Sequence, residues 1–149
     1  MCMYIPISGN IAPGNCSIIP FAPLTPAFAE DNIPCYKYVF LKEGNLTSPY
    51  HGFSYDIGKQ YVAEGNFLKI ACKGSFYYII EGGGFHSFVS PSGCSEECCL
   101  LEEEGKKEGI VMVKCHIPKG TCYYIGENVN GIPNYVSQSI MIDEIINDD

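Results

Sequence analysis

The sequence predicts an α+β fold built on a bent, mostly antiparallel β-sheet with one main helix. From residue 34 onward, short runs of aromatic and β-branched residues alternate with Gly, Pro and Asn, as strands and turns require. Only residues 92–104 have the boundaries of a helix, with Ser92 as the N-cap and Gly105 as the stop. Because this helix follows several strands in a row, we expect an antiparallel sheet.

Eight runs are expected to form strands, and turn residues separate them. They are residues 35–41, parts of 53–62, 67–72, 76–81, 85–89, 110–117, 121–125 and 135–142. Helical spacing places Cys94, Cys98 and Leu101 of the predicted helix on one face.

The first thirty residues differ from the rest in composition, with little charge and five prolines: Pro6, Pro13, Pro20, Pro23 and Pro26. Proline lacks a backbone N–H, so we expect residues 1–30 to form an extended arm. Residues 31–149 are expected to form one α+β domain, since a chain of 149 residues suits a single core. Residues 17–29 are apolar, but three prolines interrupt them and no lysine precedes them, which argues against a signal peptide.

All nine basic residues are lysine, against 17 acidic residues, for a formal net charge of −8. Nucleic-acid phosphates need a basic surface, and arginine is their usual partner. The charge therefore excludes nucleic acid as a partner, and no apolar run is long enough to span a membrane.

The nine cysteines have neither the regular spacing of a disulfide framework nor the paired Cys-x2-Cys knuckles of a zinc site. We expect buried thiols, no metal, no cofactor and a cytoplasmic location.

The run Gly82 to Phe88 is the strongest candidate for a site, because it combines backbone freedom with an imidazole, a hydroxyl and two aromatic rings. Tyrosines and lysines on the neighbouring strands suit a small anionic aromatic ligand such as a nucleotide. A structural histidine remains the alternative for His86, and strand alternation separates it from Ser87 unless the strand is twisted. The predicted ligand-binding residues are Tyr36, Lys37, Tyr50, Gly84, His86, Ser87 and Tyr135.

Several short motifs occur in a fixed order: Cys35-Tyr36-Lys37, Ser48-Pro49-Tyr50, Gly84-Phe85-His86-Ser87-Phe88 and Lys114-Cys115-x-Ile117-Pro118-Lys119-Gly120. This order resembles a family of uncharacterised small proteins of gut bacteria and their tailed phages, over residues 31–146. The resemblance implies no particular activity, and for a phage-encoded chain it implies the host cytosol. The arm and the cysteine-rich helix depart from the family pattern.

A more distant resemblance is to the ADP-ribosyltransferase layout of three motif-bearing strands. Tyr36-Lys37 stands where that family has Arg or His, Phe85-His86-Ser87 stands at the middle motif, and Ser137-Gln138-Ser139 stands where a catalytic Glu is expected. Without that glutamate the main electrostatic stabilisation of the reaction is missing. The resemblance therefore implies binding without turnover.

Three functions follow from these patterns. The first is a non-enzymatic binding protein, such as a phage-encoded anti-defence factor that sequesters a nucleotide-like host signal, with no catalytic residues. The second is a protein–protein interaction module that uses the arm, which could also mediate self-association. The third is an ADP-ribosyltransferase-like or NAD-processing enzyme.

The charge argument gives a first test. The protein is expected not to bind duplex DNA at physiological salt, because it has no basic surface to replace the counterions of the phosphates. A mobility-shift titration checks this, and a submicromolar complex that weakens with added salt would contradict it.

Overall fold

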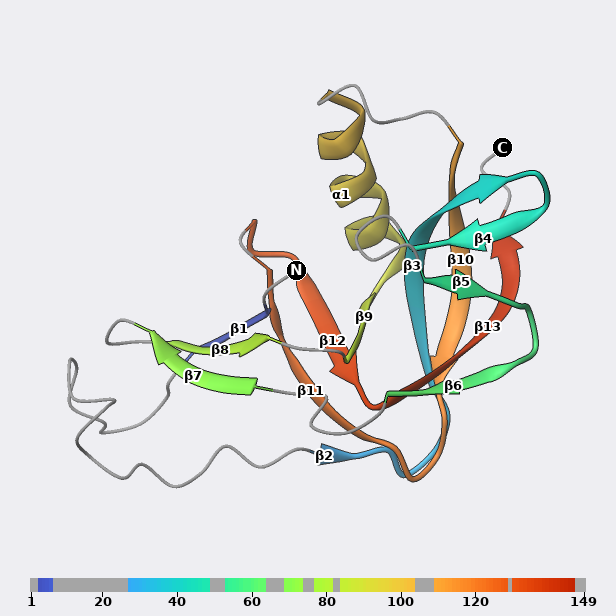
Figure 1. The fold of residues 1–149 in the computed structure, drawn as a ribbon. Helices are drawn as coiled ribbons and strands as arrows, with labels where there is room; N and C mark the ends of the chain where they lie inside the picture. Colours follow the sequence, from blue (N-terminus) through green and yellow to red (C-terminus); the bar gives the residue numbers. More distant parts are fainter. Residues whose placement is uncertain are drawn as a thin grey trace.

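The computed structural model describes residues 3–6, 27–48, 53–63, 69–73, 77–81, 84–103, 109–128 and 130–146. Within them, thirteen strands form one sheet in the order β6-β13-β10-β3-β9-β12-β11-β1-β8-β7, with β2 paired to β11, β4 to β3 and β5 to β4 (Figure 1). The strands are β1 (Met3–Pro6), β2 (Ala27–Phe28), β3 (Ile33–Lys42), β4 (Asn45–Thr47), β5 (Ser54–Tyr55), β6 (Gln60–Val62), β7 (Lys69–Lys73), β8 (Tyr77–Glu81), β9 (Phe85–Phe88), β10 (Ile110–Ile117), β11 (Cys122–Glu127), β12 (Pro133–Ser137) and β13 (Ser139–Ile146).

The expected α+β class is wrong, because the described chain is nearly all β, with one helix, α1 (Pro91–Glu103), beside the thirteen strands. The helix contacts β3, β9 and β10 and forms no second layer across the sheet. Strands β1, β2 and β4 were not predicted. Each is short and is paired with neighbouring strands, so pairing rather than a residue pattern determines it.

Residues 135–142, predicted as one strand, are divided by a corner at Gln138. The backbone N–H of Gln138 donates to the Cys122 carbonyl at 3.1 Å, and the Ser137 hydroxyl donates to the Ser139 carbonyl at 2.9 Å. As a result β12 pairs with β9 and β11, whereas β13 pairs with β10 and β6. At this corner the chain therefore passes from the strands around β9 and β11 to the strands around β10 and β6.

The two halves of the sheet meet at one narrow seam between β3 and β9. Eight residue pairs join β3 to β10, but a single pair, Tyr36 with Phe88, joins β3 to β9. The rings of Tyr38 and Phe88 stack across this seam with centroids 5.8 Å apart. The first half comprises β6, β13, β10 and β3, and the second comprises β9, β12, β11, β1, β8 and β7.

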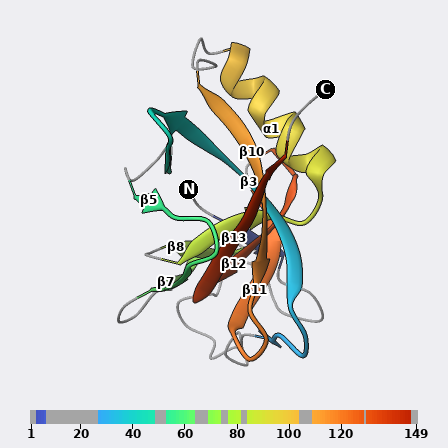
Figure 2. The same ribbon diagram turned by 90° about the vertical axis from the view of Figure 1, so that its right-hand side faces the viewer.

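Each face of the sheet buries its own apolar cluster. On the helix face, Cys94 of α1 packs with Tyr38, Phe88, Met112 and Ile132. The opposite face carries a larger cluster beside a strap formed by residues 45–48 and 53–63. The strap contributes Leu46 and Tyr55, and the other members include Cys35, Val39, Phe85, Val113, Cys115, Ile140 and Ile142. In Figure 2, α1 and β5 lie on opposite sides of β3 and β10.

The N-cap of the helix lies two residues earlier than the sequence predicts. Pro91 is its first residue, and the Ser90 hydroxyl accepts the Gly93 backbone N–H at 3.1 Å. Ser90, not Ser92, is therefore the N-cap, and proline at the first helical position suits its fixed φ. Across the described part of the chain, no helix has the length and apolar character needed to cross a membrane.

The described parts of the predicted arm are strands. Residues 3–6 lie between β8 and β11 as β1, and residues 27–28 pair with β11 as β2. Residues 1–2 and 7–26 lie outside the described residues.

The cap assignment predicts different effects for two nearby serines. Replacing Ser90 with Ala should lower the free energy of unfolding by about 1 kcal/mol, because the Gly93 N–H loses its acceptor. Ser92→Ala is the matched control and should change it less. Urea denaturation measures both, and a larger loss for Ser92→Ala would contradict the assignment.

Candidate functional site

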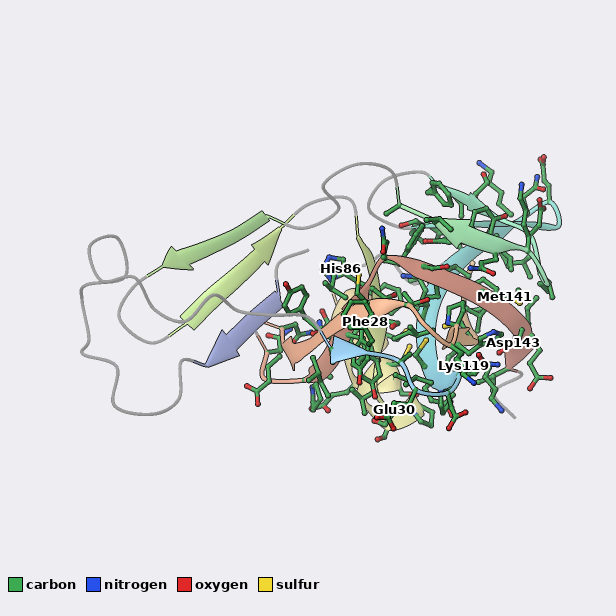
Figure 3. The ribbon with its side chains drawn as sticks, turned by 90° about the horizontal axis from the view of Figure 1, so that it is seen from below. Phe28, Glu30, His86, Lys119, Met141 and Asp143 are labelled. Carbon is green, nitrogen blue, oxygen red and sulfur yellow. The ribbon has the colours of Figure 1, made fainter. Side chains whose placement is uncertain are left out.

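The side chains of His86 and Ser87 point to opposite faces of the sheet. Along β9, Phe85 packs in the cluster beside the strap and Phe88 packs in the cluster on the helix face. Alternation therefore places Ser87 with Phe85 and His86 with Phe88. Figure 3 shows His86 on this strand, seen from below.

The other predicted site residues divide in the same way. Lys37 lies two residues from Cys35 on β3, on the strap face, and Tyr135 pairs directly with Ser87. Tyr36 pairs with Phe88 and packs on the helix face. The structure thus gathers Lys37, Ser87 and Tyr135 on one face. Gly84 precedes β9, and Tyr50 lies outside the described residues.

Lys37 bridges the seam between the two halves of the sheet. Its ammonium donates to the backbone carbonyl of His86 and lies 5.9 Å from the centroid of the Tyr55 ring. The bridge forms next to Tyr36 and Phe88, which are the single backbone pair between β3 and β9. The lysine therefore extends the contact between these strands with a charged hydrogen bond, which is stronger than a neutral one.

Four rings form an aromatic cluster, of which Phe53, Tyr55 and Tyr61 belong to the strap and Phe85 belongs to β9. The centroid of the Phe53 ring lies 5.0 Å from that of Tyr55, 5.3 Å from Tyr61 and 5.9 Å from Phe85. Tyr55 is buried, but Phe53 is 42% exposed. The cluster therefore joins the core to the surface.

A second lysine and backbone hydrogen bonds complete the surface of the aromatic cluster. The Lys59 ammonium lies 5.3 Å from the Tyr61 ring centroid, within the range of a cation–π interaction. The Tyr61 hydroxyl accepts the Asp56 N–H at 2.6 Å, and the Tyr61 carbonyl accepts the Ser139 hydroxyl at 2.8 Å. These bonds fix the Tyr61 ring against β13.

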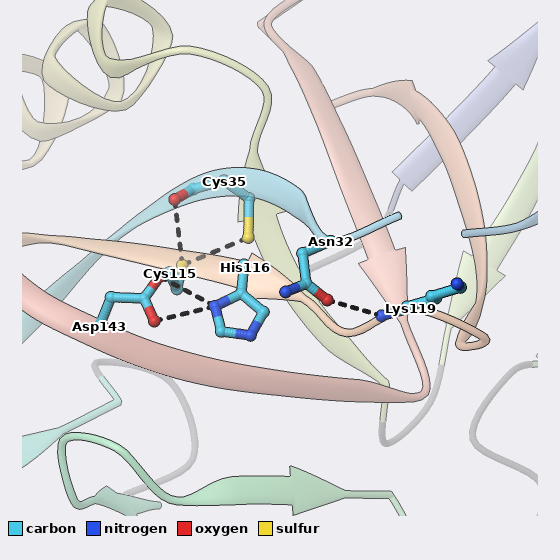
Figure 4. Close-up of polar contacts among 6 residues, drawn as sticks. All are labelled: Asn32, Cys35, Cys115, His116, Lys119 and Asp143. Atoms are coloured by element: carbon cyan, nitrogen blue, oxygen red, sulfur yellow. Dashed lines mark hydrogen bonds and ion pairs between the residues drawn. The ribbon is translucent and has the colours of Figure 1, made fainter. Parts of the chain in front are cut away.

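Two cysteines lie side by side on the strap face, on the two strands of the first half of the sheet that are nearest the seam. Cys35 of β3 pairs directly with Cys115 of β10, both are 0% exposed, and their Sγ atoms are 3.3 Å apart (Figure 4). The Cys115 thiol also donates to the Cys35 carbonyl at 3.3 Å. The sequence placed both among the buried thiols but did not bring them together, because eighty positions separate them.

The two thiols differ in acidity. The hydrogen bond between the two thiols lowers the pKa of Cys35, against the effect of burial, and the Ser87 hydroxyl and the Lys37 charge lower it further. Burial raises the pKa of Cys115 well above its ordinary value, and the hydrogen bond with Cys35 adds to this. Cys35 is therefore the thiol of the pair that ionises first.

The Ser87 hydroxyl is 1% exposed and meets no hydrogen-bond partner of normal geometry among the described residues. It faces the same side as Cys35 and favours its thiolate. On the helix face, the amide of Asn134 is equally buried and likewise meets no partner within the described chain. Such side chains are uncommon in native structures.

His116 and Asp143 form an exposed pair that the sequence did not predict. The His116 Nδ1 lies 2.8 and 2.9 Å from the two carboxylate oxygens of Asp143 (Figure 4). The pair depends on a β-bulge between β10 and β13, which gives Asp143 no direct partner opposite it. Met141, Asp143 and Lys119 are labelled at this end of the molecule in Figure 3. Exposed ion pairs add little stability.

Among the described residues, no three histidine, cysteine, aspartate or glutamate side chains gather around one point. No protein-family model, curated protein or solved structure matches this sequence or its fold. The function therefore has to be argued from the site itself.

The seam gives a prediction about Lys37. Replacing Lys37 with Met keeps the aliphatic stem but removes the hydrogen bond to the His86 carbonyl, and should lower the free energy of unfolding by about 1–2 kcal/mol. Lys119→Met is the control, since that side chain is exposed. Equal denaturation midpoints for the two variants would show that the bridge contributes nothing to the seam.

Proposed function

We propose that this protein binds a small anionic ligand with a planar ring, such as a nucleotide, without transforming it. The carrying observation is the exposed ring of Phe53 at the edge of the aromatic cluster, with the Lys59 ammonium over the adjacent Tyr61 ring. This extends the predicted ligand class to a surface that shares Lys37 with the predicted ligand-binding residues and Phe85 with the candidate run Gly82 to Phe88.

The aromatic cluster suits stacking because three rings hold Phe53 in place while part of its own ring stays exposed. Ile57, on the same strap, is 51% exposed. A planar base can stack on such a surface, and stacking on an aromatic side chain contributes roughly 1–3 kcal/mol per base. Since the surface is held in shape by packing, little order has to be gained on binding.

Charge limits the size of the ligand. Lys59 supplies a point charge for a phosphate beside the rings, and Lys37 is already engaged at the seam. The net charge of −8 repels a long polyanion but leaves a mononucleotide or a small dinucleotide able to bind at a local lysine.

The third motif of the ADP-ribosyltransferase resemblance is Ser137-Gln138-Ser139, and its hydrogen bonds favour binding without turnover. The motif strands β3, β9 and β12 are neighbours in the sheet. At the third motif, however, Ser137 donates to the Ser139 carbonyl and Ser139 donates to the Tyr61 carbonyl, so both hydroxyls hold the corner and the strap. Gln138 accepts from the Cys122 thiol there. We propose that the bound ligand is sequestered, in a phage setting as a nucleotide-like host signal.

A thermal-shift panel tests the proposal with AMP, ADP-ribose, NAD and cyclic dinucleotides as probes. A ligand present at a hundredfold its Kd should add about 2.7 kcal/mol of stability. Calorimetric titration of any positive compound then gives its affinity, and chromatography of the recovered ligand shows whether it is unchanged.

Matched variants locate the site. Phe53→Ala and Lys59→Gln should each weaken binding, Phe53→Ala by roughly tenfold or more because it removes the stacking surface. Ile125→Ala and Lys119→Gln are controls that remove an exposed apolar side chain and an exposed charge elsewhere.

Two results would contradict the proposal. One is the absence of any stabilisation across the panel. The other is equal loss of affinity in the strap variants and their controls, which would show that binding does not use the aromatic cluster.

A further inference from the structure

We propose that Cys35 and Cys115 are a redox pair that forms a cross-strand disulfide when the protein meets a small hydroperoxide. This modification site is independent of ligand binding at the aromatic cluster.

The position of the two thiols carries the inference. They occupy directly opposed positions on β3 and β10, and their Sγ atoms are 3.3 Å apart. A disulfide requires about 2.0 Å, so the sulfurs have to approach by about 1.3 Å, a distance that small side-chain rotations can supply. The eight residue pairs between these strands keep the sulfurs opposed.

The surroundings assign different roles to the two sulfurs. The Ser87 hydroxyl has no hydrogen-bond partner of normal geometry among the described residues. Both Ser87 and Lys37 favour a thiolate at Cys35. Cys115 is the more deeply desolvated thiol and keeps its proton. Cys35 is therefore the nucleophile toward the oxidant, and Cys115 resolves the product.

The chemistry proceeds in two balanced steps. The Cys35 thiolate attacks the peroxide O–O bond and becomes a sulfenic acid, with hydroxide as the leaving group. The Cys115 sulfur then displaces the hydroxyl from Cys35, and the hydroxyl leaves as water with the Cys115 thiol proton. Two electrons pass from the sulfurs to the peroxide. Because both thiols are 0% exposed, the oxidant reaches them only during local opening of the structure, and a small peroxide needs less opening than a large one.

The test uses the full chain, reduced and then exposed to hydrogen peroxide together with free glutathione as an internal reference. The protein is then unfolded in denaturant so that the buried thiols react, and the remaining thiols are labelled with a maleimide and counted by mass spectrometry. We expect two fewer labels than in the reduced protein, a peptide cross-link between Cys35 and Cys115, and full recovery of labelling after dithiothreitol. Glutathione oxidised while Cys35 and Cys115 stay labelled would overturn the proposal, as would a link to any other cysteine.

Variants test the order of the two steps. In Cys115→Ser, or in Cys115→Ala if the serine variant does not fold, the resolving thiol is absent, so dimedone should trap a sulfenic acid at Cys35. In Cys122→Ser the hydroxyl can still donate to Gln138, and the cross-link should form as in the natural sequence. The matching variant Cys35→Ser retains Cys115. If dimedone labels Cys115 in that variant but does not label Cys35 in Cys115→Ser, the assigned roles are reversed and the assignment is overturned.

Discussion

The narrow seam between β3 and β9 is the contact on which the arrangement of this protein depends. One residue pair, Tyr36 with Phe88, continues the sheet from its first half to its second. Two side-chain contacts reinforce it from the two faces: the stacked rings of Tyr38 and Phe88 on the helix face, and the Lys37 ammonium on the His86 carbonyl on the strap side. Since so few backbone bonds cross this line, side chains decide the angle between the halves.

The strap owes its position to the corner at Gln138, where the chain passes between the same two halves. The Ala63 N–H donates to the Gln138 carbonyl at 2.8 Å, and the Gln60 amide donates to the Ser139 hydroxyl at 3.0 Å. These bonds tie β6 to the start of β13 and bring Tyr61 against Phe53. The proposed ligand surface is therefore a consequence of how the corner is hydrogen-bonded, and its rings are ordered before a ligand arrives.

The buried thiol pair and the seam are coupled through Lys37. The lysine lies two residues from Cys35, its charge favours a thiolate there, and its ammonium holds β9. A disulfide between Cys35 and Cys115 would link β3 to β10. Lys37, two residues further along the same strand, links β3 to β9. Oxidation and the geometry of the seam thus act on the same strand.

The sequence by itself determined the main strands, since alternating aromatic and β-branched runs specify β3, β9, β10 and β11 with small boundary errors. It predicted His86 and Ser87 as members of one site, although side-chain alternation along the strand already argued against this. Only the tertiary structure decided what depends on contacts between distant residues. Short strands such as β1 and β4 form because a strand pairs with them on each side, and the helix face is too small to make an α+β layer. Cys35 meets Cys115 across a register set by eight residue pairs, and His116 meets Asp143 through a bulge, neither of which leaves a local pattern in the chain.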